Sequence, residues 1–152
     1  MEELLAGLVV LGQGVPHLAE ARVVRHVEDL GAATVDLDAV VAAAFFHDAI
    51  YDPTSAGNEV ASGRLAATAL GELGWDAGRI ANVDDMIVAT AHHELGDATT
   101  DQAVLFAADL AVLAAEPAGY SDYMRNVRRE YAHVTDPDWV TGRSAVLRSF
   151  LG

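Results

Sequence analysis

The chain has 152 residues, of which 52% are hydrophobic and none is a cysteine. This length and apolar content predict one globular domain with its own core, while the absence of cysteine excludes disulfides, thiol catalysis and thiolate metal ligands. The 23 acidic residues against nine basic ones, all arginines, give a formal charge of -14. That charge opposes binding to nucleic acid polymers and to anionic membranes.

Apolar residues recur at helical spacing along almost the whole chain, and no segment alternates in the manner of a strand. We therefore predict an all-α fold, a single compact helical bundle of about seven or eight helices that fills one domain, residues 1–152. Glycine, proline and capping residues set the ends of these helices. The predicted helices cover residues 2–12, 16–31, 37–51, 57–73, 77–93, 101–115, 117–132 and 137–150.

The N-terminal segment MEELLAGLVVLG is short and acidic, whereas a signal peptide begins with basic residues. No apolar run reaches the roughly 18 residues that span a bilayer, so we expect a cytoplasmic protein without a membrane partner. The next predicted helix begins near His17, which shares a helix face with Val24 and Val27. We therefore expect His17 to point towards the core.

In the predicted helix 37–51, an apolar run that ends at Phe46 leads directly into His47 and Asp48. Both side chains start from an apolar helix wall, and a second carboxylate, Asp52, lies four residues beyond Asp48. Burial of an ionised carboxylate in such a place is unfavourable unless a cation accompanies it. This segment is therefore the first candidate for a functional site.

Two later helices carry similar polar residues on apolar stripes. Predicted helix 77–93 closes with His92 and His93, and predicted helix 101–115 carries Asp109 beside Leu105 and Phe106. Each has an ordinary explanation alone, since a core histidine can be hydrogen-bonded and Asp109 could pair with an arginine. Together, imidazoles and carboxylates that converge from several helices predict a divalent cation site inside a bundle.

The order His, His-Asp and Asp on successive helices resembles the HD superfamily of metal-dependent phosphohydrolases, and more narrowly its branch of predicted metal-dependent HD phosphohydrolases. The resemblance covers most of the chain, and its most specific parts are the surroundings of the dipeptide rather than the dipeptide itself. The segments that carry it are FFHDAIYDP with NEVASGRLA, IVATAHH, FAADLAVLAAEP, and RREYAHV with GRSAVLRSFL.

The resemblance implies an HD-type bundle that hydrolyses a phosphate ester, with a metal-activated water as nucleophile and a nucleotide or other small phosphorylated metabolite as substrate. The expected cofactor is a divalent metal ion: Mn, Ni, Co, Zn or Mg. The metal ligands that it implies are His17, His47, Asp48 and Asp109. The catalytic residues that it implies are Asp52, His92 and His93, and a phosphate could be bound by Arg22, Arg25 or Arg128.

The first metal ligand has two candidates. His17 lies on a face that is apolar, as expected of a helix that supplies a ligand, whereas His26 lies beside Arg22 and Asp29. We favour His17 on this ground, and His26 stays open.

Two further functions stay open beside phosphate hydrolysis. Ala107 stands where the branch commonly has an aspartate, so the site could have drifted to bind a small molecule or to catalyse a non-hydrolytic step without metal. A diiron HD oxygenase is the other function, with Fe as its metal.

Asn58 and Glu59 could support the site, or Asn58 could cap helix 57–73. The Ala/Val-rich helices are compatible with a homodimer.

Overall fold

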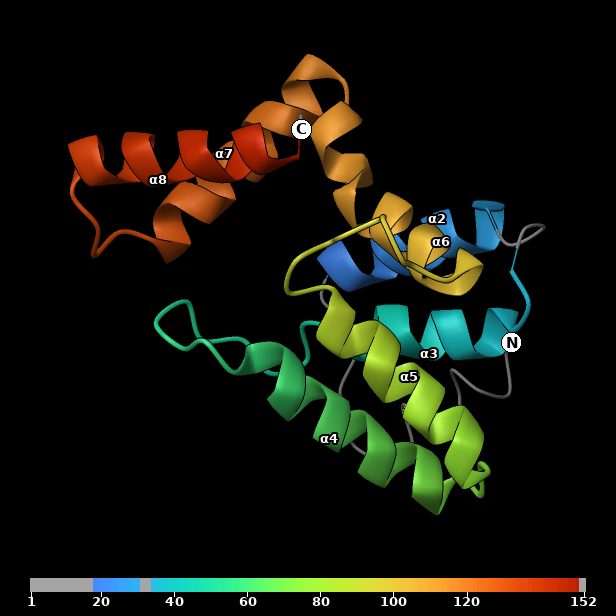
Figure 1. The fold of residues 1–152 in the computed structure, drawn as a ribbon. Coiled ribbons are helices and arrows are strands. Elements are labelled where there is room, and N and C mark those ends of the chain that lie inside the picture. The colour runs from blue at the N-terminus through green and yellow to red at the C-terminus, as the bar shows by residue number, and fades with distance from the viewer. Residues whose placement is uncertain (1–17, 31–33, 151–152) are drawn as a thin grey trace. The chain divides into compact units, whose positions relative to one another are not determined.

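The computed structural model describes residues 18–30 and 34–150 (Figure 1). This part of the chain is helical and contains no strand, which confirms the predicted all-α class. Predicted helix 2–12 and His17 lie outside the described residues. The described elements are α2 (Leu18–Leu30), α3 (Leu37–Phe46), α4 (Asn58–Glu72), α5 (Ala77–Ala89), α6 (Thr100–Leu110), the 3-10 helix η2 (Ala111–Ala114), α7 (Pro117–Glu130) and α8 (Asp136–Ser149).

The chain divides into two compact units, Met1–Ala111 and Val112–Gly152. The first, called the site unit, contains α2 to α6, and the second, called the C-terminal unit, contains α7 and α8. That residues 1–152 form one domain stays a prediction.

Helix α3 is the centre of the site unit. Every residue from Ala39 to Phe46 is buried, because α3 packs against α2, α4, α5 and α6 (Figure 1). A helix that is apolar all round is stable in water only when other elements enclose it. Its small alanines and valines let these neighbours approach closely, so α3 is held firmly and positions the site at its C-terminal end.

Asp101 fixes the start of α3 relative to α6. Its two carboxylate oxygens accept hydrogen bonds from the backbone amides of Val35 (2.7 Å) and Asp36 (3.2 Å). Since Asp101 lies in the first turn of α6, this contact aligns α6 with α3 from the beginning of both helices. The other end of α6 then reaches the end of α3, where Asp109 meets His47.

Asp36 itself is held by the guanidinium of Arg79 on α5, whose Nε and Nη2 both lie 2.6 Å from the carboxylate. The hydrogen bond from Arg79 is the main reason that the pKa of Asp36 lies below its ordinary value. Arg79 also stacks on Trp75, with Cζ 3.8 Å from the ring centroid. Trp75 is thus a packing residue, and α5 is tied to the same end of α3.

Helices α4 and α5 form the most closely packed pair of the site unit (Figure 1). Gly63 allows this approach, because a Cβ at residue 63 would overlap a carboxylate oxygen of Asp84. Asp84 is half-buried by this contact, while the adjacent Asp85 is exposed.

Three helix ends differ from the sequence prediction in a way that shapes the site. The predicted helix 37–51 ends at Phe46, and the predicted helix 77–93 ends at Ala89. The predicted helix 101–115 ends its α-helical part at Leu110 and continues as η2. His47, Asp48 and His93 thus lie on turns that follow helices, whereas the sequence predicted that they lie within helices.

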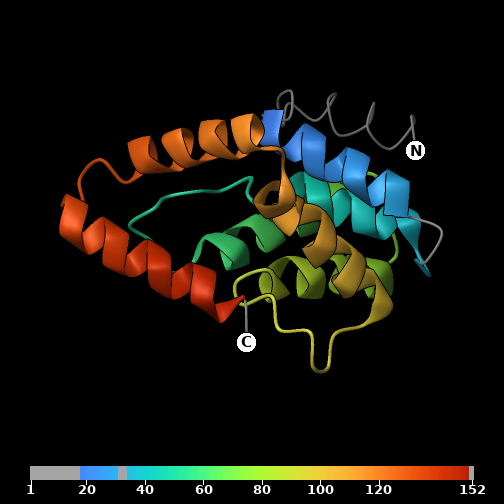
Figure 2. The same cartoon turned by 90° about the horizontal axis from the view of Figure 1, so that it is seen from above.

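In the C-terminal unit, α7 and α8 run in opposite directions and form a helical hairpin (Figure 2). Its connection is held by Arg128, which donates to the carbonyls of Tyr131 (2.6 Å) and Val134 (3.1 Å). Trp139 packs against the ring of Tyr131 at 5.6 Å, as a helix-packing residue should. No residue of α7 or α8 is buried.

No single helix within residues 18–30 and 34–150 has the length and apolarity to cross a membrane, although Thr100–Ala114 and Pro117–Glu130 taken together do meet those two criteria.

Candidate functional site

His47 occupies the C-terminal cap of α3 and is only 4% exposed. Its Nδ1 lies 2.9 Å from the carbonyl oxygen of Ala44, and since a carbonyl can only accept, Nδ1 carries a hydrogen. This bond fixes the ring orientation and turns Nε2 towards two carboxylates. The same arrangement, with one nitrogen held by a carbonyl, is common for histidines that ligate a metal through the other nitrogen.

Two aspartates face His47 Nε2 from different parts of the chain. Asp109 Oδ1, from the last turn of α6, lies at 3.4 Å, and Asp48 Oδ2, from the adjacent turn, lies at 3.5 Å. The side chain of Asp109 is 24% exposed and that of Asp48 is 55% exposed. The three side chains therefore form a group that is closed towards the core at His47 and open to solvent at Asp48.

His93 joins this group from the turn that follows α5. Its Nε2 lies 2.7 Å from Asp109 Oδ2, while its ring packs against Phe106 at a centroid distance of 5.1 Å. The backbone of His93 has a φ of 52°, a left-handed conformation that costs an ordinary residue on the order of 1–2 kcal/mol. The ring packing and the charged hydrogen bond offset this cost, so the strain marks a residue whose place is imposed by the site.

The ion pairs shift the titration of Asp109 and His47 in opposite directions. Burial alone would raise the pKa of Asp109, but hydrogen bonds from His47 and His93 hold that pKa well below its usual range. Burial alone would lower the pKa of His47, but the hydrogen bond and charge of Asp109, with the charge of Asp48, raise it to about 9. Without a bound cation, the pair is therefore an imidazolium and a carboxylate at neutral pH.

Asp48 differs from Asp109 in the balance of the charges around it. Crowding by the surrounding chain is the main reason that the pKa of Asp48 lies above its ordinary value, since His47 and His93 lower this pKa while the negative charges of Asp109 and Glu59 raise it. Since its side chain is more than half exposed, solvent screens these effects. The two imidazoles therefore offset the negative charge of Asp48 less than that of Asp109.

Residues 47–57 connect α3 to α4 and are called the site loop. Its Asp52 is exposed, and Asp52 Oδ1 accepts hydrogen bonds from the backbone amide (2.8 Å) and hydroxyl (2.7 Å) of Thr54. Asn58 bonds both the amide and the carbonyl of Asp52, at 3.0 Å and 2.9 Å. Gly57, and not Asn58, is the N-cap of α4, so Asn58 serves the loop and not the helix end.

Ser62 also belongs to this region, although the sequence pattern did not single it out. It is fully buried on α4, and its hydroxyl bonds both the amide (3.0 Å) and the carbonyl (3.3 Å) of Ile50. The spacing of Ser62, four residues after Asn58 and so on the same helix face, was the available signal in the sequence.

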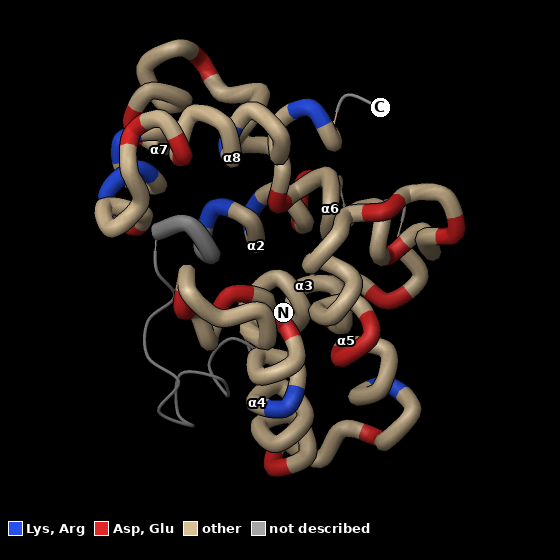
Figure 3. Tube along the Cα trace, turned by 60° about the vertical axis from the view of Figure 1, so that its left-hand side comes forward, with Lys and Arg blue, Asp and Glu red and all other residues tan. Residues whose placement is uncertain are grey.

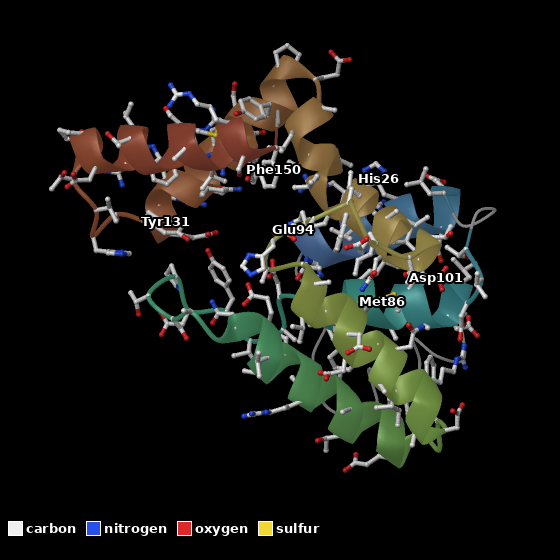
Figure 4. The ribbon with its side chains drawn as sticks, in the orientation of Figure 1. His26, Met86, Glu94, Asp101, Tyr131 and Phe150 are labelled. Atoms are coloured by element: carbon white, nitrogen blue, oxygen red, sulfur yellow. The ribbon has the colours of Figure 1, made fainter. Side chains whose placement is uncertain are left out.

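The remaining predicted residues do not meet at this group in the described part of the chain. His92 is exposed, next to the inward-turned His93, and His26 is half-buried on α2 (Figure 4). Among the described residues, the imidazoles that reach Asp109 come from His47 and His93, and none comes from His26. Whether His17 supplies a further ligand is a prediction that lies outside the described residues.

The donor atoms suit a divalent cation in type. Ligand atoms about 2.1 Å from one ion lie about 3.0–3.4 Å from each other, close to the 3.4 Å and 3.5 Å that separate His47 Nε2 from its two carboxylate oxygens. Within residues 18–30 and 34–150, however, no three His, Asp or Glu side chains are disposed around one point as a complete metal site. His47, Asp48 and Asp109 are thus the residues that would hold an ion, and their side chains would have to move to do so.

Comparison of the chain with protein-family models, with curated proteins and with solved structures found no match.

Proposed function

We propose that this chain is a metal-dependent phosphohydrolase of HD type, acting on a nucleotide or another small phosphorylated metabolite. The observation that supports it best is the buried imidazole of His47, fixed through Nδ1 and facing the carboxylates of Asp48 and Asp109. A buried imidazole between two carboxylates from separate parts of the chain is a donor set typical of divalent metal centres in helical bundles. A cation bound there would act as a Lewis acid and lower the pKa of a bound water.

The protein residues would have distinct roles in that reaction. His47 and Asp109 would form the buried side of the site, and Asp48 its solvent side. His93 would hold the second oxygen of Asp109 and keep that carboxylate oriented. Asp52 would accept a proton from the attacking water, with its carboxylate oriented by Thr54.

The charge of the site unit supports a small substrate. This unit holds 18 of the 23 acidic residues and four of the nine arginines, and Figure 3 shows acidic positions recurring along its helices and loops. Such a surface repels a polyanion but admits a single phosphate that a bound cation attracts. A cytoplasmic location and a homodimer stay predictions.

A second candidate, a metal-free module that binds a small molecule, is favoured by one observation. His47 and His93 already offset the charge of Asp109 by direct contact, at 3.4 Å and 2.7 Å, so the group is stable without a cation.

Elemental analysis of protein purified without added metal, followed by a phosphatase screen with Mn2+, separates the candidates. Hydrolysis predicts about one Mn, Ni, Co or Zn per chain and Mn2+-dependent phosphate release. Near two Fe per chain would indicate the oxygenase, and a protein that neither retains nor binds metal would leave the metal-free module.

A further inference from the structure

The site loop is attached to α4 by a repeated pattern of side-chain hydrogen bonds. Ser62 bonds the amide and the carbonyl of Ile50, and Asn58 bonds the amide and the carbonyl of Asp52. Asn58 and Ser62 are four residues apart on α4, and the loop residues whose backbone groups they bond are two residues apart in the sequence. Asn58 also donates to the carbonyl of Ser55 at 3.3 Å, which closes the loop behind Asp52.

The four hydrogen bonds to Ile50 and Asp52 are similar in arrangement to those along one edge of a β-ladder. In an antiparallel ladder, a residue exchanges both backbone hydrogen bonds with one partner, and alternate residues of a strand face the same side. Positions four apart on a helix are separated by roughly 6 Å, and positions two apart in an extended strand by roughly 6.6 Å. The spacing of Asn58 and Ser62 therefore matches the spacing of Asp52 and Ile50, and α4 replaces a partner strand.

Because positions 58 and 62 are buried, the hydrogen bonds to the loop backbone require polar side chains at both positions. Ser62 is fully buried and Asn58 is 9% exposed, whereas Ile50 and Tyr51 of the loop are 42% and 47% exposed. The loop itself has little apolar anchorage, so its position depends on these hydrogen bonds. Loss of either side chain would release the backbone that lies between Asp48 and Asp52.

We propose that Asn58 and Ser62 act together as positioning residues, which hold the site loop against α4 and thereby place the carboxylate of Asp48 beside His47. This inference rests on the proposed metal site, because it gives the two residues a role in the affinity of that site for a cation. It assigns them no direct contact with metal or substrate. Residues that orient metal ligands in this way commonly change metal affinity by roughly 10- to 100-fold when removed.

Mn2+ titration of the full chain tests the role directly, with Ser62→Ala and Asn58→Ala as the loop variants. Thr68→Ala is the matched control, since Thr68 lies on the same helix and its hydroxyl bonds only the carbonyl of Arg64 at 3.0 Å. We expect both loop variants to bind Mn2+ roughly 10- to 100-fold more weakly than the wild type, and Thr68→Ala to match the wild type. Circular dichroism should show the same helix content in all four proteins.

A second measurement keeps the two proposals separate. Amide exchange at Ile50 and Asp52, and the ring resonances of His47, can be followed by NMR without any metal. We expect faster exchange in each loop variant at the amide that lost its acceptor, together with a shift of the His47 resonances as Asp48 moves. Thr68→Ala should change neither.

Three outcomes contradict one proposal or the other. If the wild type binds Mn2+ and both loop variants bind it equally well, the positioning role is wrong while the metal site stands. If the loop amides exchange faster but the His47 resonances stay unchanged, the loop is held without placing Asp48, and the role is again wrong. If the wild type itself binds no Mn2+, the proposed function fails, and the NMR result alone decides whether the loop attachment positions Asp48.

Discussion

The two units of this chain differ in how far their helices are buried and in their net charge. The site unit encloses an apolar helix on all sides and carries the whole formal charge of -14, with 18 acidic residues against four arginines. The C-terminal unit has five residues of each sign, is neutral, and has no buried residue in either helix. Stability and candidate chemistry are therefore concentrated in the first unit, whereas the second relies on half-buried aromatic and arginine contacts.

The largest expected difference between the units is in the cost of removing a large side chain. Phe46→Ala should lower the free energy of unfolding by about 3–5 kcal/mol, because Phe46 is fully buried at the end of α3. Trp139→Ala removes a larger but half-buried ring and should cost about 1–2 kcal/mol. Urea unfolding of both variants measures the difference, and equal losses would contradict the comparison.

The next effect is a pH dependence that arises in the site unit. The pKa of His47 is raised from 6.5 to about 9, so its stabilisation is fully present below pH 6.5 and is lost as the pH rises through 9. By pH 10, metal-free protein should lose at most about 3 kcal/mol of stability relative to pH 6. In His47→Gln this loss should be absent, and urea unfolding in the presence of a chelator at both pH values provides the measurement.

A smaller loss is expected at the other end of α3. Asp101→Ala removes the acceptor of two backbone amides that start this helix, at a cost of about 2 kcal/mol. Asp97→Ala, in the exposed loop before α6, should change stability by less than about 0.5 kcal/mol. Asp101 lies in the first turn of α6 and Asp109 in its last turn, so a loss at Asp101 would measure the alignment of the helices apart from the site itself.

The smallest effect should come from the C-terminal unit. Arg128 is 31% exposed, and its ion pair with Asp136 is at the surface, where such pairs contribute little. Asp136→Asn should therefore lower the free energy of unfolding by less than about 1 kcal/mol. A loss as large as that of Asp101→Ala would mean that the hairpin connection is more important to the fold than its exposure indicates.

Helical periodicity predicted the all-α class and the position of every described α-helix, but it placed the ends of α3, α5 and α6 too late, and the end of α3 matters most for the site. His47, Asp48, Ala49 and Ile50 contain no glycine or proline, so nothing in the local sequence ends a helix there. The helix ends because Ser62 and Asn58, from α4, take up the backbone groups of Ile50 and Asp52. A long-range contact of this kind leaves no trace in local propensity.

The candidate site was predictable in its residue types and only partly in its contacts. Asp109 on an apolar stripe and the His47-Asp48 pair indicated a buried polar group, and the structure brings them within 3.5 Å. That His93 rather than His92 turns inward depends on a left-handed backbone at residue 93, which the sequence does not encode as a glycine. The pairing of Asp109 with two histidines, in place of an arginine, was likewise visible only in the structure.

The central claim is that His47, Asp48 and Asp109 bind one divalent cation, and the Mn2+ affinity of Asp109→Asn tests it most directly. Asp85→Asn, which alters an exposed carboxylate on α5, is the matched control for the change of charge. We predict that the wild type and Asp85→Asn bind about one Mn2+ per chain with equal affinity, and that Asp109→Asn binds it at least roughly 100-fold more weakly. Equal Mn2+ binding by wild type and Asp109→Asn, or none by the wild type, would contradict the claim.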